Sequence, residues 1–161
     1  MKLPFKDKYY CIDTSPLIVL KNYYARDIFP SLWQDFDKLI QERIVIAPRE
    51  VFRELEQIAD ELWQWAKARK KMFRKLDREQ IQFAQDIMAR FPDLVDPEKE
   101  TPDADPFVVS LARSESGIVI TEERRTGPSP SGRPKIPNVC DAFGVRCLTL
   151  TDFFREQNWK Y

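Results

Sequence analysis

The chain alternates short apolar runs with longer segments in which apolar residues recur at helical spacing. The apolar runs predict four buried strands, at residues 9–12, 44–46, 117–121 and 145–150. Helical spacing predicts helices at residues 16–23, 31–43, 49–62, 105–115, 138–143 and 151–157, and a helical stretch over residues 60–90 with a break near 75–78. Turn-forming residues predict loops at residues 91–103 and 124–137.

This alternation of strand and helix predicts an α/β fold, because short right-handed crossovers place successive strands parallel in one sheet. We therefore predict a three-layer α/β/α sandwich with a central, mainly parallel sheet of about four strands. The length of 161 residues suits one domain with its own core. We predict a single domain over residues 1–161.

Two acidic residues lie next to predicted helix starts. The first helix has its own start signals, because Ser15 is a good N-cap and Pro16 suits the first helical position. Asp13 is then free for another role, and the alternative is a turn aspartate that bonds its own backbone. Asp105 precedes Pro106, so it can serve as an N-cap, as a ligand, or as both.

The composition indicates in which cellular compartment the protein is expected. No apolar run approaches the ~18 residues of a membrane span, and the N-terminal residues lack the apolar segment of a secretory signal. We therefore expect a cytoplasmic protein without a membrane partner. The three cysteines are an odd number without metal-like spacing, which predicts free thiols at Cys11, Cys140 and Cys147.

The most restrictive feature is that the chain contains no histidine. This excludes Ser-His-Asp and Cys-His catalysis, a histidine general base and the usual zinc sites. The formal net charge is zero, so bulk charge does not indicate a nucleic-acid partner, although a balanced total can hide patches of each sign.

Acidic residues gather where strands are predicted to end. Asp13 follows the first strand, Glu122 and Glu123 follow the strand at 117–121, and Asp105 begins the helix before that strand, with Asp103 as its near competitor. In open parallel sheets, active sites form beyond the carboxyl ends of the strands. These acids are therefore expected to face one site.

A further acid is expected from the helix at residues 49–62. Its glutamates flank the predicted buried stripe, and spacing alone does not select among Glu50, Glu54 and Glu56. For any one of them the alternative is a solvated side chain that pairs with a nearby arginine.

Several carboxylates that converge without histidine predict a hard divalent cation site, because Mg²⁺ and Mn²⁺ prefer oxygen ligands. Such ions can activate water and stabilise a leaving oxygen in phosphodiester cleavage. A cation also removes the repulsion among the acids.

Four segments, YCIDTSPLI, IAPREVFRELEQI, DADPFVVSLAR and GIVITEE, resemble in order and spacing the acidic motifs of the PIN-domain ribonucleases. The tail PKIPNVCDAFGVRCLTLTDFF resembles a prokaryotic PIN-like subfamily of uncharacterised proteins, many of them suspected toxins of toxin–antitoxin pairs. The resemblance implies metal-dependent hydrolysis of RNA. RNA is then the expected substrate, and an antitoxin protein and a homodimer are candidate partners.

The resemblance also implies roles for individual residues. It places Mg²⁺ or Mn²⁺ on Asp13, Glu54 and Asp105, and so selects Glu54 among the three glutamates. Many members have an aspartate at the fourth position, where this chain has Glu123, and Asp141 is a further candidate ligand with a surface role as its alternative. The candidate substrate-binding residues are Thr14, Ser15, Thr121, Arg124 and Arg125.

Two basic stretches are candidates for contact with an RNA backbone. Residues 67–75 carry six cations, and the loop at 124–137 adds more beside Glu123. The alternative is a solvated helix face and a solvated loop. For Trp63, Trp65 and Phe73, packing is expected rather than base stacking, because they recur on a helix that must bury one side.

Three functions remain open at this point. The first is a metal-dependent endoribonuclease that acts as a toxin. The second is a catalytically weak PIN-like module that binds RNA or a protein, which the change at the fourth acidic position favours. The third, a small nucleotide-binding α/β protein, lacks a Gly-rich phosphate loop, and the chain has only four glycines.

Overall fold

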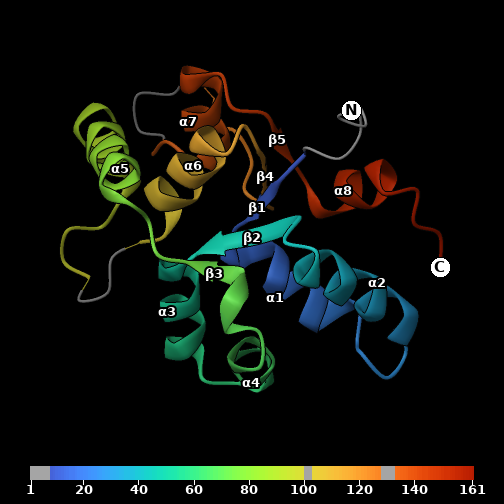
Figure 1. Cartoon of the computed structure of the whole chain (residues 1–161). Coiled ribbons are helices and arrows are strands. Elements are labelled where there is room, and N and C mark those ends of the chain that lie inside the picture. Colours follow the sequence, from blue (N-terminus) through green and yellow to red (C-terminus); the bar gives the residue numbers. More distant parts are fainter. Residues whose placement is uncertain (1–7, 100–102, 128–132) are drawn as a thin grey trace.

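A computed structural model describes residues 8–99, 103–127 and 133–161. Its centre is one all-parallel sheet of five strands in the order β3-β2-β1-β4-β5 (Figure 1). The strands are β1 (Tyr10–Ile12), β2 (Val45–Pro48), β3 (Phe73–Arg74), β4 (Ile118–Ile120) and β5 (Cys147–Leu148). In the register, β1 pairs on one side with β2 and on the other with β4.

Helices cover both faces of this sheet, so the predicted three-layer α/β/α arrangement is confirmed. In Figure 1, α5, α6 and α7 lie on one side of the sheet and α1 to α4 on the other. The helices are α1 (Thr14–Tyr23), α2 (Pro30–Gln41), α3 (Arg49–Ile58), α4 (Glu61–Lys67), α5 (Arg78–Arg90), α6 (Asp105–Ser114), α7 (Ile136–Phe143) and α8 (Leu150–Glu156), with short 3₁₀ turns η1 (Lys70–Met72) and η2 (Pro92–Leu94).

The core explains why the strands read as continuous apolar runs. A parallel sheet covered on both faces buries every residue of its inner strands, and β1, β2 and β4 are buried along their whole length. Fully buried Leu17 and Phe36 from one helical layer and Leu111 from the other complete the core. This rigid centre fixes the residues that follow β1 and β4.

The sheet has one strand more than predicted. The stretch at residues 60–90 was expected to be helical, but it forms α4, η1, the two-residue strand β3 and α5. Asp60 and Asp77 accept hydrogen bonds from the first turns of α4 and α5, so two N-caps separate the helices. β3 was missed because it has only two half-buried residues and no apolar run.

The predicted caps at the two acidic helix starts were wrong. Ser15 lies inside α1, and Asp13 takes the N-cap position without a side-chain cap hydrogen bond. Ala104 is the N-cap of α6, and Asp105 is the first helical residue. Neither acid therefore caps its helix through its side chain.

Trp63, Trp65 and Phe73 pack against other aromatic residues of the protein, as predicted. Trp65 is 3% exposed, and its ring lies 5.6 Å from Trp33. Trp63 and Phe73 both pack against Phe52, with ring centroids 4.5 and 5.1 Å away. These rings therefore support the fold, with Trp65 buried and Trp63 and Phe73 half-buried.

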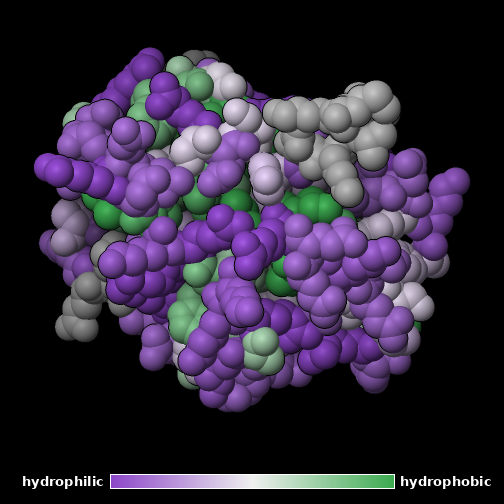
Figure 2. All heavy atoms as spheres, viewed as in Figure 1, coloured by the Kyte–Doolittle hydropathy of each residue, from purple (hydrophilic) through white to green (hydrophobic). Residues whose placement is uncertain are grey.

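The face of the molecule drawn in Figure 2 is mainly hydrophilic. Figure 2 shows purple side chains over most of this face, with hydrophobic atoms confined to gaps between them. Across the described ranges, no helix has both the length and the apolar character needed to span a membrane.

Gly117 is required where α6 turns into β4. A Cβ built at this position would lie 2.9 Å from the backbone oxygen of Tyr9, which accepts the hydrogen bond from Ile118 that begins the β1–β4 ladder. We expect Gly117→Ala to lower the free energy of unfolding by about 1–3 kcal/mol, because the clash is with backbone. Thermal denaturation tests this, with Gly127→Ala as control because its Cβ would meet nothing within 4 Å. Equal melting temperatures for the two variants would contradict it.

Candidate metal centre

The site begins where the neighbouring strands β1 and β4 end. Asp13 follows β1, and its backbone N–H donates to the oxygen of Ile120 at 3.0 Å. Thr121 follows β4, and its hydroxyl donates to Oδ2 of Asp13 at 3.0 Å. Asp13 is 4% exposed and Thr121 is 1% exposed. The sheet therefore holds a buried carboxylate just beyond the carboxyl ends of its strands.

Glu54 joins this carboxylate from α3. Its Oε2 accepts a hydrogen bond from the hydroxyl of Thr14 at 2.9 Å, and its Oε1 accepts one from the backbone N–H of Ala104 at 2.7 Å. Glu54 thus ties the start of α1 to the start of α6. Glu56 is exposed, and Glu50 is buried with its Oε2 unpaired among the described residues. Of the three glutamates, the structure places Glu54 beside the residues that follow Asp13.

Asp105 is electrostatically coupled to the other acids. Burial, followed by the charges of Asp13, Glu123 and Glu54, raises the pKa of Asp105 to about 9. Burial and the charge of Glu123 raise the pKa of Asp13 to about 7, and burial also raises the pKa of Glu54. Asp13 and Asp105 thus resist ionisation in the field of neighbouring acids, and the site favours an added positive charge.

Asp103, the near competitor of Asp105, is held by its own loop. Its Oδ2 accepts from the backbone N–H of Asp96 at 2.9 Å, and its Oδ1 pairs with Lys99 at 2.5 Å. The two aspartates therefore differ in role, because Asp103 organises the loop and Asp105 belongs to the acidic site.

Glu123 and Glu122 diverge after β4. Oε2 of Glu123 accepts from the backbone N–H of Ile136, the first residue of α7, at 2.9 Å. Oε1 of Glu122 accepts from Leu150 at the start of α8, at 2.7 Å. Glu123 thus contributes charge to the site while it also holds α7. The role of Glu122 at α8 was not predicted from the sequence, although adjacent residues in extended backbone point to opposite sides.

The small polar residues predicted to bind substrate make hydrogen bonds to the carboxylates of the site. The hydroxyl of Ser15 donates to Oδ2 of Asp13 at 3.1 Å and accepts from the backbone N–H of Glu122 at 3.1 Å. Thr14 and Thr121 are buried, and both donate to acids of the site. These hydroxyls therefore position the carboxylates, and their contact with a substrate stays a prediction.

Asp141 and Arg125 form an ion pair with each other at the surface. Nε and Nη2 of Arg125 bind the two carboxylate oxygens of Asp141 at 2.6 and 2.8 Å, and both side chains are more than half exposed. This arginine holds the pKa of Asp141 below its usual range. Asp141 therefore pairs at the surface, in line with the surface role that was its alternative, and the contact of Arg125 with RNA stays a prediction. Arg124 lies in the same loop, of which residues 128–132 fall outside the described residues.

The donor set suits a hard divalent cation, because Asp13, Glu54, Asp105 and Glu123 offer only oxygen ligands. The described part of the chain nevertheless contains no group of three or more acids or cysteines already arranged around a cation. The hydrogen bonds above explain this, since oxygens of Asp13, Glu54 and Glu123 face protein donors. Binding of a cation therefore requires some of these side chains to turn.

Comparison with known proteins adds a family but no activity. No curated protein matches this sequence. One family model covers residues 10–161, from the first strand of the sheet to the last residue. Its description names no substrate or reaction, so the resemblance to the PIN-domain ribonucleases stays a prediction. The chain belongs to the family described as domain of unknown function DUF4411.

Proposed function

We propose that this protein is a metal-dependent endoribonuclease that hydrolyses RNA phosphodiester bonds, with Asp13, Glu54 and Asp105 as ligands of Mg²⁺ or Mn²⁺ and Glu123 as a supporting acid. The observation that carries the proposal is that Asp13 is buried beyond the ends of β1 and β4, with half-buried Glu54 tied by hydrogen bonds to Thr14 and to the start of α6, where Asp105 lies. Burial and the neighbouring acids raise the pKa of Asp13 and of Asp105. A histidine-free chain can perform this hydrolysis only with other groups, and acids with a divalent cation suffice.

The residues of the site have different roles in the proposed hydrolysis. A bound divalent cation would polarise the phosphate and lower the pKa of attacking water. In the metal-free protein, Thr121 and Ser15 donate to Oδ2 of Asp13 and Thr14 donates to Glu54, so these hydroxyls position the acids until a cation enters. Near neutral pH, Asp105 retains its proton because its pKa is about 9, and an entering cation would displace that proton.

A cleavage assay with purified protein tests the proposal. Labelled RNA is incubated with Mn²⁺, with EDTA, and with EDTA followed by excess Mn²⁺. We expect cleavage only when the cation is present, with recovery on its return. Cleavage that continues undiminished in EDTA would exclude this mechanism.

A second candidate is a catalytically weak module that binds RNA. Two observations favour it: Oε2 of Glu123 is already bound by Ile136, and the acids of the described residues are not prearranged around a cation. RNA binding that is tight and indifferent to divalent cations, without turnover, would support this candidate over the first.

Thr121→Val is expected to lower cleavage about 10- to 100-fold while the protein stays folded. The change keeps the side-chain shape but removes the donor to Asp13 and the acceptor for the N–H of Glu123, which lies 3.2 Å from the hydroxyl. Loss of such supporting hydrogen bonds has this effect at metal sites. Steady-state cleavage rates against Mn²⁺ concentration measure it, and Thr121→Ser serves as control because it keeps the hydroxyl. Equal losses for Val and Ser would show that the hydroxyl is not responsible.

The biological setting also stays a prediction. A toxin role, an antitoxin partner, a homodimer and a cytoplasmic location all derive from the resemblance or the composition. A small DNA-binding protein encoded by the neighbouring gene would support the toxin role.

A further inference from the structure

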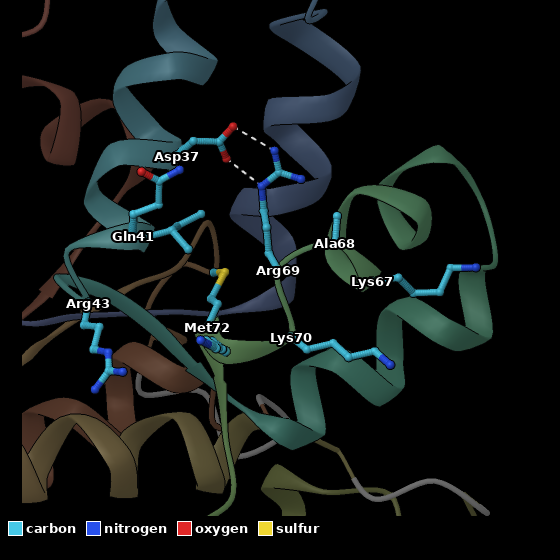
Figure 3. Close-up of a pocket in the computed structure, with 10 residues that line it drawn as sticks. Asp37, Gln41, Arg43, Lys67, Ala68, Arg69, Lys70 and Met72 are labelled. Carbon is cyan, nitrogen blue, oxygen red and sulfur yellow. Dashed lines mark hydrogen bonds and ion pairs between the residues drawn. The ribbon is translucent and has the colours of Figure 1, made fainter.

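A basic pocket of about 640 Å³ lies near the amino ends of β2 and β3. The acids lie at the other end of the sheet, beyond the carboxyl ends of β1 and β4. The pocket is formed by the end of α2, the turn before β2, the end of α4 and η1 (Figure 3). Because every strand is parallel, these segments lie at the amino ends of β2 and β3, whereas Asp13 and Thr121 follow carboxyl ends. The lining residues are Asp37, Ile40, Gln41, Arg43, Lys67, Ala68, Arg69, Lys70, Lys71 and Met72.

One ion pair is internal to the pocket. Nε and Nη2 of Arg69 bind the two oxygens of Asp37 at 2.6 and 2.7 Å, and the guanidinium lies 4.6 Å from the ring centre of Trp65. In Figure 3, the side chain of Arg69 points toward the carboxylate of Asp37. This pair is neutral, so it shapes the pocket without adding net charge.

Four cations remain around the pocket without a carboxylate partner in the part of the chain that is described: Arg43, Lys67, Lys70 and Lys71. All four residues are exposed, and in Figure 3 Arg43, Lys67 and Lys70 point away from the Asp37–Arg69 pair. Like charges gathered without counter-ions repel one another. An anionic ligand would relieve that repulsion.

We propose that this pocket binds phosphates of an RNA backbone, as an anchor remote from the acidic site. The inference rests on the proposed function, because it assigns the pocket to the same substrate. Phosphate contacts need only lysine and arginine and no particular order of residues.

The lining favours RNA over an acidic protein. Protein interfaces depend on aromatic and apolar anchors and are depleted in lysine. The lining contains no aromatic residue, and its larger apolar members, Ile40 and Met72, are 9% and 2% exposed. The pocket thus offers charge but little apolar area for a protein partner to cover.

The separation of the two sites gives a dependence on RNA length. The two sites lie at opposite ends of the parallel strands, so an RNA that contacts both must pass over the surface between them. A longer RNA is therefore expected to contact both sites more readily than a short one.

Fluorescence anisotropy with single-stranded RNA tests the anchor, with EDTA present so that no cleavage occurs. RNAs of about 5 and about 25 nucleotides are compared. The test variant is Lys70→Gln with Lys71→Gln. The control is Arg78→Gln with Lys160→Gln, which removes two exposed cations outside the pocket.

For the long RNA, we expect the pocket variant to bind roughly 10- to 30-fold more weakly than wild type at about 0.1 M salt, because two phosphate contacts are lost. The slope of log affinity against log salt should also fall by about 1.4, at about 0.7 per contact. The control should bind like wild type. Equal affinities for the pocket variant and the control would overturn the proposal.

A polyglutamate of similar charge separates RNA from acidic protein. If it binds as tightly as the long RNA and with the same dependence on Lys70 and Lys71, the pocket takes acidic protein and the RNA proposal fails. Cleavage is measured separately with Mn²⁺. If RNA binding depends on the pocket but no RNA is cleaved, the proposed enzyme is rejected and the anchor is retained. If RNA is cleaved but its binding does not depend on the pocket, the anchor is rejected and the proposed enzyme is retained.

Discussion

Asp13→Asn is expected to lower metal-dependent RNA cleavage about 10³-fold and to leave the protein folded. Loss of a charged ligand removes several kcal/mol of stabilisation of the transition state, and each 1.36 kcal/mol corresponds to a tenfold change in rate. Asparagine is a good residue at the N-cap position that Asp13 occupies. It also removes a buried charge whose neighbours oppose its ionisation. Activity should therefore be lost while the melting temperature holds or rises.

The matched control is Asp86→Asn, on the exposed side of α5, where the carboxylate bonds only to the side chain of Gln82 among the described residues. This variant should cleave like wild type. For each variant, the cleavage rate and the thermal denaturation are measured on the same protein preparation. Full cleavage by Asp13→Asn, or equal losses in the two variants, would contradict the assignment.

The metal-free protein is expected to lose stability as the pH rises from about 4 to about 9. The ordinary pKa of an aspartate is 3.8, whereas folding raises the pKa of Asp13 to about 7 and that of Asp105 to about 9. Between these values the folded state holds more protons than the unfolded state, so stability falls with rising pH. Below about pH 4 both states are protonated and the penalty is absent.

Thermal denaturation in EDTA at about pH 5, 7 and 9 measures this loss. We expect the Tm to fall by roughly 10 °C, because the shifts together amount to several kcal/mol and each kcal/mol moves the Tm of a chain this size by about 2–4 °C. Asp13→Asn should reduce the slope, and Mn²⁺ should restore the Tm most at high pH. A Tm that is constant or rises with pH would show that the acids do not oppose one another.

The fold was predictable because its signals are local. The buried strands β1, β2 and β4 are apolar runs that the core requires, and the acids that end β1 and begin α6 were visible from that pattern. β3 was not predictable, since its two half-buried residues lie in a basic stretch and its pairing with β2 is a tertiary contact. Asp60 and Asp77 are N-caps that could have indicated two separate helix starts, but the helical spacing of apolar residues favoured one helical stretch.

The site was predictable only in part. Asp13 and Asp105 followed from strand and helix ends, but the choice of Glu54 over Glu50 and Glu56 needed the resemblance. The structure supports that choice through the hydrogen bonds of Glu54 to Thr14 and Ala104. The sequence could not show that Glu123 also holds α7, because the bond to Ile136 joins residues across a loop.

The pairing of Asp141 with Arg125 was hidden for the same reason. Sixteen positions separate the two residues, and their contact depends on how α7 lies beside the loop after β4. Similarly, the basic stretch at residues 67–75 does not form one cationic helix face. It contributes Lys67, Lys70 and Lys71 to a pocket, while Arg69 is neutralised by Asp37.

The central claim is that the acids at the carboxyl edge of the sheet bind a divalent cation, and diffraction from a Mn²⁺-soaked crystal tests it most directly. The account predicts an anomalous peak within ligand distance of oxygens from Asp13, Glu54 and Asp105, which is lost in Asp13→Asn crystals soaked in the same way. Mn²⁺ that appears only elsewhere, or a peak that persists at full height in Asp13→Asn, would contradict it.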